Sequence, residues 1–200
     1  MNPFDPGYFG EEELGKMGFR SIGHNVRIAK TCTIIGLDGI EIGDNVRIDG
    51  YCTITATGGG RVHLGSYIHI GGYGFLSGSG GIRIGDFSTL SQGVRIYTGS
   101  DDYSGQHMTN PMVPVMYTGV TRGPVTLGRH VIVGSGAVVL PGVTLGDGVA
   151  VGALALVKSD LNPWGVFCGC PAKKIKDRSR QLLDLEAQFK QTLAGPESAP

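Results

Sequence analysis

Apolar residues recur every six positions through most of this chain, and this period constrains the fold more than any other feature. An α-helix repeats about every 3.6 residues and a flat strand about every two, so a period of six fits neither. It is typical of a chain that turns a corner after each short strand, with three faces closing one triangular coil. In the second half the anchors are Leu127, Val133, Val139, Leu145, Val151 and Val157.

The first half follows the same rule in sets of three anchors. The sets are Ile22, Ile28, Ile34; Ile42, Ile48, Ile54; Leu64, Ile70, Leu76; and Ile84, Leu90, Ile96. Successive sets are separated by two, four and two residues more than the period requires. Because these extra residues follow every third anchor, one corner of the triangle takes the insertions. The pattern predicts an all-β chain, a parallel β-helix of about six triangular coils.

The largest insertion separates Ile96 from Leu127 and covers about residues 98–125. Loops of this length inside a compact domain are usually functional. Its Tyr, Met and Pro content predicts that it packs on something, such as a neighbouring subunit.

The coils predict three regions: an N-terminal arm over 1–20, the β-helix over 21–160, and a C-terminal crossing segment and helix over 161–200. A short helix is expected within the arm, at 11–18. The C-terminal helix is predicted because Leu182, Leu185, Phe189 and Leu193 follow helical spacing. Its apolar stripe packs on the protein itself or binds a foreign partner.

Composition excludes several classes of function. The formal net charge is +0, so no general basic surface points to nucleic acid. The sequence has no run of 18 apolar residues, so no membrane span is expected. The four cysteines accompany no visible secretory signal, so reduced thiols and a cytoplasmic location are expected. Cys168-x-Cys170 lacks a second Cys or His pair at zinc-site spacing, so no metal is expected.

The stretch from Leu127 to Val157 resembles the hexapeptide-repeat acyltransferases, and GCPAKKIK at 169–176 resembles the segment that follows the coils in that family. The resemblance implies a left-handed β-helix, a homotrimer with active sites between subunits, and acetyl-CoA or another acyl-CoA as co-substrate. The loop sequence YTGSDDYSGQHMTNPMVP resembles a narrower branch, the N-acyltransferases of nucleotide-linked aminodeoxysugars of the dTDP-4-amino-4,6-dideoxyglucose type. This branch implies a role in surface polysaccharide or O-antigen biosynthesis.

Asp101 lies where galactoside, maltose and serine acetyltransferase relatives place a histidine that acts as general base on a hydroxyl. A free aspartate has a pKa of about 3.9, so it is a weak base for an alcohol. A neutral amine already carries its lone pair, so it needs to be positioned more than it needs to be deprotonated. The replacement therefore favours an amino acceptor. The alternative is that Asp101 and Asp102 only cap a turn, since Asp-Asp-x-Ser-Gly is good turn chemistry.

Two further residues are catalytic candidates. The resembling N-acyltransferases use a serine at the position of Ser91 to contact the amine or the reacting carbonyl; its alternative role is that of a polar corner residue. His107 lies in the loop but not at the position of Asp101, where the relatives have their histidine. It is a candidate general base that would approach the acceptor from another direction. The remaining histidines form no convergent set of three, so the zinc site of a β-helical carbonic anhydrase is not expected.

The regular coils after Leu127 are the candidate donor site. By resemblance, Ser135 and Ala153 flank the pantetheine arm, while Gly136 and Gly152 keep the groove shallow. The same resemblance implies that the coenzyme phosphates bind two lysines of the last segment, Lys173 and Lys176. The alternative is that these lysines only form a solvated basic patch.

The leading hypothesis is an acyl-CoA-dependent N-acyltransferase in which the amine of a nucleotide-linked sugar attacks the thioester directly. The first alternative is a sugar O-acetyltransferase with His107 as base. The second is a non-catalytic β-helix scaffold that uses the loop and the C-terminal helix to bind a partner.

Overall fold

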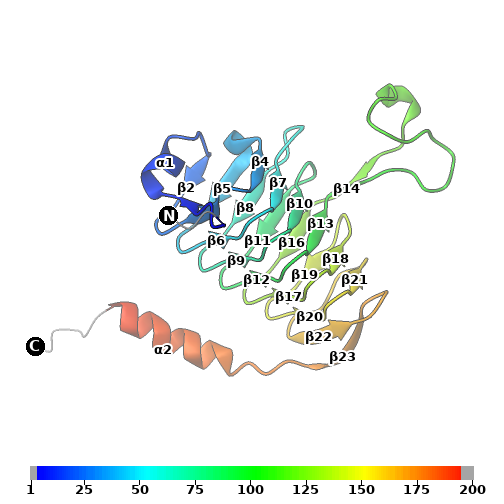
Figure 1. Cartoon of the computed structure of the whole chain (residues 1–200). Helices are drawn as coiled ribbons and strands as arrows, with labels where there is room; N and C mark the ends of the chain where they lie inside the picture. The colour runs from blue at the N-terminus through cyan, green and yellow to red at the C-terminus, as the bar shows by residue number, and fades with distance from the viewer. Residues whose placement is uncertain (1–3, 195–200) are drawn as a thin grey trace, which may run out of the picture.

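The structure is a computed structural model that describes residues 4–194. Residues 1–3 of the predicted arm and residues 195–200 of the predicted C-terminal segment lie outside the described residues. Short strands stack into the predicted left-handed parallel β-helix, whose three sheets meet at three corners (Figure 1). Six complete coils are followed by an incomplete seventh, made by a bridge between Leu161 and Leu145 and by β22 (Gly165–Cys168).

Each coil adds one strand to each sheet. The first sheet contains β2 (Ser21–Ile22), β5 (Ile40–Ile42), β8 (Val62–Leu64), β11 (Ile82–Ile84), β16 (Val125–Leu127) and β19 (Thr144–Leu145). The second contains β1 (Tyr8–Phe9), β3 (Arg27–Ala29), β6 (Arg47–Ile48), β9 (His69–Ile70), β12 (Thr89–Leu90), β17 (Ile132–Val133), β20 (Ala150–Val151), β22 and β23 (Lys173–Asp177). The third contains β4 (Thr33–Ile35), β7 (Thr53–Thr55), β10 (Phe75–Ser77), β13 (Arg95–Tyr97), β18 (Val138–Val139) and β21 (Leu156–Val157).

We call the corner between the first and second sheets the first corner, that between the second and third sheets the second corner, and that between the third and first sheets the third corner. The extra residues of the sequence lie at the third corner, where the 3₁₀ turn η1 (Leu37–Gly39) and the long loop are found. Insertions there leave the other two corners regular.

The six-residue anchors stack on one another in register. In the second sheet, for example, Ile48 pairs with Ile28 on one side and with Ile70 on the other. Because neighbouring coils present equivalent side chains to the interior, the anchors form three continuous apolar columns. All anchors from Ile42 to Val157 are buried. The period therefore correctly predicted the core and the pairing of the coils.

Helix α1 (Glu11–Gly15) closes the N-terminal end of the core. Leu14 is buried against the first coil, and the backbone amide of Gly10 donates a hydrogen bond of 2.9 Å to the carboxylate of Glu13. β1 adds an antiparallel strand beside β3. A repeat fold needs such end caps because its last coil would otherwise expose the core to water.

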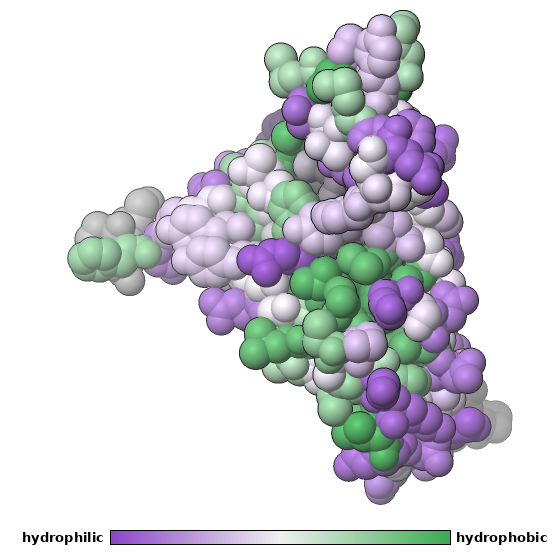
Figure 2. All heavy atoms as spheres, turned by 90° about the vertical axis from the view of Figure 1, so that its right-hand side faces the viewer, coloured by the Kyte–Doolittle hydropathy of each residue, from purple (hydrophilic) through white to green (hydrophobic). Residues whose placement is uncertain are grey.

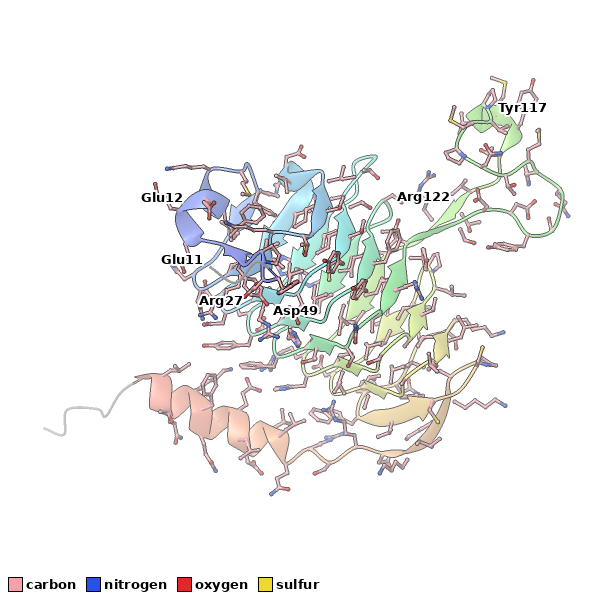
Figure 3. All side chains as sticks on the ribbon, in the orientation of Figure 1. Glu11, Glu12, Arg27, Asp49, Tyr117 and Arg122 are labelled. Atoms are coloured by element: carbon pink, nitrogen blue, oxygen red, sulfur yellow. The ribbon has the colours of Figure 1, made fainter. Side chains whose placement is uncertain are left out.

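Asp49 fastens this arm to the coils from the second sheet (Figure 3). Its carboxylate accepts hydrogen bonds from Arg47 at 2.8 Å and from the Tyr8 hydroxyl at 3.0 Å, and lies 2.8 Å from Nε2 of His69. Burial opposes the charge on Asp49, but the hydrogen bonds from Arg47, His69 and Tyr8 outweigh it and lower its pKa to about 2.

The predicted loop leaves the coils after β13 and returns at β16. Its base is a two-stranded antiparallel ribbon, β14 (Gly99–Ser100) and β15 (Thr121–Arg122), and its tip carries a 3₁₀ turn, η2 (Val115–Tyr117). The loop projects from the body of the protein at the upper right of Figure 1. On that side of the molecule, apolar surface gathers below the loop (Figure 2).

Helix α2 (Leu182–Ala194) runs back along the coils beneath the second sheet (Figure 1). The Phe189 ring meets Tyr67 edge-on at 5.3 Å and Phe87 at 6.4 Å. Glu186 pairs with Arg129 and lies 2.6 Å from Nε2 of His130. The helix therefore packs on its own chain at the first corner.

Removing one core anchor should weaken the fold measurably. Leu76→Ala is expected to lower the free energy of unfolding by about 3 kcal/mol, because Leu76 is fully buried between Ile54 and Ile96. Ile35→Ala, a control on the outward face of the same sheet at 49% exposure, should cost less than about 1 kcal/mol. Urea unfolding followed by circular dichroism compares the two, and equal losses would contradict the assignment of the core.

Candidate functional site

The second corner brings one catalytic candidate and four donor-site candidates together on neighbouring coils. The Ser91 amide donates a 2.9 Å hydrogen bond to the carbonyl of Val133, directly before the turn that holds Ser135 and Gly136. The Gly136 amide donates to Gln92 at 2.9 Å, and the Leu154 amide donates to Ser135 at 2.9 Å. Gly152 and Ala153 therefore occupy the same turn one coil further along.

Two glycines keep the surface of this corner shallow. A Cβ at Gly136, where φ is +68°, would lie 2.8 Å from Cδ2 of Leu154. A Cβ at Gly152 would lie 2.9 Å from the Cβ of Cys168. With Ser135 and Ala153 exposed beside them, the turns form a shallow surface of backbone and small side chains. Such a surface lets a flexible chain with amide groups approach backbone donors and acceptors.

The two lysines of the predicted donor site lie beyond this surface, on β23. Lys173 pairs with Cys168, at the end of β22 that reaches the second corner. Lys176 pairs with Val166, toward the other end of the same strands. Both side chains are exposed, so Lys173 is the better placed of the two to meet a ligand at the corner.

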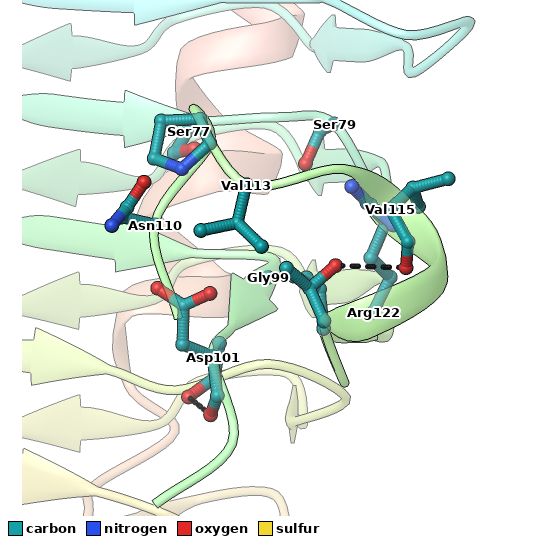
Figure 4. A pocket seen from close by; sticks show the side chains of 12 residues that line it. Ser77, Ser79, Gly99, Asp101, Asn110, Val113, Val115 and Arg122 are labelled. Carbon is teal, nitrogen blue, oxygen red and sulfur yellow. Dashed lines mark hydrogen bonds between the residues drawn. The ribbon is translucent and has the colours of Figure 1, made fainter. Parts of the chain in front are cut away.

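The loop encloses the pocket that contains Asp101 (Figure 4). Its volume is about 490 Å³. Its walls come from the loop and from the ends of coils at the third corner, including Ser77, Ser79, Asn110 and Arg122. The Asp101 side chain points into the pocket, toward Asn110 and Val113 (Figure 4). Among residues 4–194 no side chain hydrogen-bonds to the Asp101 carboxylate, so it is available to a ligand.

Asp102 is engaged within the loop. Its carboxylate accepts hydrogen bonds from the Ser104 amide at 2.8 Å, the Ser104 hydroxyl at 3.0 Å and the His107 amide at 2.9 Å. Nδ1 of His107 lies 3.2 Å from the same carboxylate. The hydrogen bonds from Ser104, followed by those from His107, hold the pKa of Asp102 well below its usual range. The turn chemistry expected for the aspartate pair is thus seen at Asp102.

Removing this carboxylate should loosen the loop. In Asp102→Ala, amide hydrogen exchange at Ser104 and His107 is expected to accelerate roughly tenfold, because each amide loses its acceptor. Asp160→Ala removes a similar bond to the Thr144 amide elsewhere and should leave exchange in the loop unchanged. Exchange measured by mass spectrometry distinguishes the two, and an unchanged loop in Asp102→Ala would contradict this role.

A single chain does not bring Ser91 and Asp101 together. Ser91 precedes β13 at the second corner, whereas Asp101 follows β14 beyond the third corner. The strand between them alone spans roughly 10 Å. Any site that uses both side chains on one substrate would therefore need Ser91 from one copy and Asp101 from another.

Sequence reasoning missed six polar residues of the pocket: Ser77, Ser79, Ser100, Asn110, Thr118 and Arg122. Ser77 and Ser79 precede the loop by a whole coil, and no periodic signal links them to it. Arg122, at the root of the loop in Figure 3, has no ion-pair partner among the described residues. Its position just before the chain re-enters the coils is the one cue the sequence offered.

In the described part of the chain, no helix has both the length and the apolar character needed to cross a membrane. Within residues 4–194 there is also no group of three or more His, Cys, Asp or Glu side chains that could hold a metal ion.

Two family models match the coils. One, described as bacterial transferase hexapeptide (six repeats), matches residues 124–159, and the other, described as hexapeptide repeat of succinyl-transferase, matches residues 21–56. The chain is also 45% identical over 188 residues to an Escherichia coli dTDP-4-amino-4,6-dideoxy-D-glucose acyltransferase, which covers 94% of this chain and 97% of the relative.

Solved structures of AntD, an N-acyltransferase from Bacillus cereus, share the fold closely. The complex of AntD with dTDP and 3-hydroxybutyryl-CoA has a TM-score of 0.90 and 39% identity, covering 94% of this chain and 99% of AntD. A variant of AntD with dTDP-4-amino-4,6-dideoxyglucose and coenzyme A matches with the same TM-score of 0.90 and 39% identity over 94% and 99% of the two chains. The chain belongs to the hexapeptide-repeat acyltransferases, in the branch of the nucleotide-linked amino-sugar N-acyltransferases.

Proposed function

We propose that this protein transfers an acyl group from a coenzyme A thioester to the amino group of a dTDP-linked 4-amino-4,6-dideoxyhexose. The observation that carries the proposal is the 45% identity to a relative of that name over 94% of this chain, a length that includes the coils and the loop. AntD, similar in fold over the same length, binds dTDP, the amino sugar and coenzyme A. Surface polysaccharide synthesis and a cytoplasmic location remain predictions from the sequence.

Ser91 and Asp101 are the proposed catalytic pair. AntD has been studied as variants at a serine and at an aspartate ten positions after it. In this chain Ser91 and Asp101 are separated by the same spacing. The free carboxylate of Asp101 in its pocket and the half-buried corner position of Ser91 fit residues that touch a substrate from two sides.

The chemistry proposed for this site is direct aminolysis. The sugar nitrogen attacks the thioester carbonyl, the new C–N bond forms as the C–S bond breaks, and the departing sulfur takes the proton of the amine. Asp101 accepts a hydrogen bond from the amine and fixes the direction of its lone pair, so alignment supplies much of the rate. A backbone amide of the second corner stabilises the negative charge that develops on the carbonyl oxygen.

We further propose that the active protein is a homotrimer with its sites between subunits. The separation of Ser91 from Asp101 within one chain supports this arrangement, because a neighbouring copy can place its projecting loop against the second corner. In this arrangement Ser135, Gly136, Gly152 and Ala153 line the pantetheine arm of the donor. The coenzyme phosphates would meet the basic side chains of β23, which are Lys173 and Lys176.

One observation favours the O-acetyltransferase alternative. Nδ1 of His107 lies 3.2 Å from the Asp102 carboxylate, which is the arrangement of a base and the group that orients it. However, His107 does not line the pocket around Asp101. The family of this chain consists of enzymes, which argues against the scaffold alternative.

An acceptor panel tests the proposal. Purified protein is assayed with acetyl-CoA and a set of dTDP-, UDP- and GDP-linked amino sugars, together with matching sugars that carry a hydroxyl in place of the amine. Thiol release and the mass of the product report the reaction. An amide formed with the dTDP-linked 4-amino sugar supports the proposal; an ester formed at a hydroxyl, or no turnover with any amine, would contradict it.

A further inference from the structure

The second corner repeats one backbone position in five successive coils. These turn residues have positive φ: Tyr51 at 61°, Tyr73 at 61°, Gly93 at 70°, Gly136 at 68° and Leu154 at 58°. Glycine adopts this left-handed conformation freely, whereas a tyrosine does so at a cost of about 1 kcal/mol or more. Tyrosines at this position in two neighbouring coils therefore call for an interaction that compensates for the conformational cost.

The two tyrosines form an exposed aromatic pair. Their ring centroids are 5.1 Å apart and their planes differ by 13°, so the rings are stacked. Tyr51 is 60% exposed and Tyr73 is 57% exposed. Tyrosine is enriched at binding interfaces because it combines an apolar ring with a polar hydroxyl.

The first corner has a similar aromatic stack, which is covered by a side chain of α2. There Tyr67 stacks on Phe87 at 4.8 Å, and Phe87 stacks on His130 at 5.0 Å. The side chain of Phe189 from α2 lies edge-on against this stack. The equivalent stack at the second corner has no such cover within residues 4–194.

We propose that Tyr51 and Tyr73 form the platform for the pyrimidine base of the acceptor nucleotide, an inference that rests on the proposed function. Every nucleobase presents a flat π-face to an aromatic side chain, so stacking binds it without a dedicated hydrogen-bonding pocket. The platform would hold the nucleotide, while Ser91 and Asp101 act on the sugar at its other end.

The order of residues along the corner supports this assignment. Ser91 follows the coil of Tyr73, and the Gly93 amide donates a 2.9 Å hydrogen bond to the carbonyl of Gly72. The donor candidates Ser135 and Ala153 lie on the opposite side of Ser91, toward the C-terminus. With coils about 4.8 Å apart, Tyr51 lies roughly 10 Å from the Ser91 coil. A sugar and its diphosphate fill such a gap, which leaves the base beside the tyrosines.

Nucleotide binding tests the platform. Titration calorimetry uses dTDP without the sugar as the titrant, in the presence of saturating coenzyme A. It compares the wild type with Tyr51→Ala, Tyr73→Ala and Tyr73→Phe. The Kd for dTDP is expected to rise about tenfold in each alanine variant and to stay within about twofold in Tyr73→Phe, which keeps the stacking ring. The KM for acetyl-CoA should not change. Leu154→Ala, at the same turn position on the donor side, is the matched control and should leave the Kd for dTDP unchanged.

The possible outcomes separate the platform from the proposed function. Unchanged dTDP affinity in both alanine variants would overturn the platform alone. Alanine variants that sediment as monomers while the wild type sediments as an oligomer would also overturn it, because the pair would then be a contact between copies. A wild-type protein that binds no dTDP would contradict the proposed function and the platform together.

Discussion

Asp101→Asn is expected to lower kcat about 100-fold with acetyl-CoA and a dTDP-linked amino sugar, while the KM for acetyl-CoA changes little. Asparagine keeps the size of the side chain but removes its charge and one of its two acceptor oxygens. The amine would then lose the group that orients its lone pair and attracts its protonated form before deprotonation. Steady-state kinetics with both substrates varied measure the effect.

The control is Asp38→Asn. Asp38 lies in η1, at the same third corner of the triangle but in the first coil, and is not part of the loop pocket. Its variant should match the wild type in both kcat and KM. If Asp101→Asn also matched the wild type, Asp101 would be a turn residue only and the proposed mechanism would be wrong.

The same assay distinguishes the two proposed bases. His107→Ala should reduce kcat less than Asp101→Asn does, because His107 contacts Asp102 and Gly119 rather than the pocket. If instead His107→Ala abolished activity and the wild-type rate followed the ionisation of an imidazole, the O-acetyltransferase alternative would be favoured.

The coils were predictable because the information is local and repeated. Ile48, Ile54 and Leu64 each occupy a position that the period alone assigns to the interior, and each is buried there. Register followed from the same rule, since one anchor must stack on the next. The position of the loop followed too, because an insertion that breaks the period must leave the triangle at a corner.

The site was less predictable because its parts are far apart in the chain. Ser77 and Arg122 share one pocket wall only after the loop folds back beside the coil before it. Asp101 and Asp102 are adjacent in sequence, yet Asp102 binds Ser104 within the loop while Asp101 stays free. No composition or spacing rule separates these two roles. The difference arises from the direction in which the turn points each carboxylate.

The C-terminal helix shows the same limit. Its spacing predicted an amphipathic helix, but the surface that receives it depends on contacts distant in sequence. Glu186 reaches Arg129 and His130, and Arg178 donates hydrogen bonds to the carbonyls of His130 at 2.7 Å and Gly148 at 3.1 Å. These contacts occupy the first corner, so α2 leaves the second corner, where Ser91 and the donor candidates lie, uncovered.

Mixing two inactive variants should restore activity if the site is shared between copies. Ser91→Ala supplies an intact loop with Asp101, and Asp101→Ala supplies an intact second corner with Ser91. When the two are co-expressed in equal amounts with different tags and purified through both, mixed trimers contain sites built from one intact half of each. Every trimer purified through both tags contains both variants, so one of its three sites is complete, and about one third of wild-type turnover is expected.

The control is a mixture of Asp101→Ala with Asp101→Asn, which assembles in the same way but contains no intact Asp101 and should not exceed the residual activity of Asp101→Asn alone. If the Ser91→Ala and Asp101→Ala mixture were equally inactive, each site would have to lie within one chain. The loop would then have to fold back across β13 to bring Asp101 to Ser91, which differs from the projecting position that it has in this structure. Recovery of activity would instead show that the loop acts on the second corner of a neighbour, which explains why it projects from its own coils.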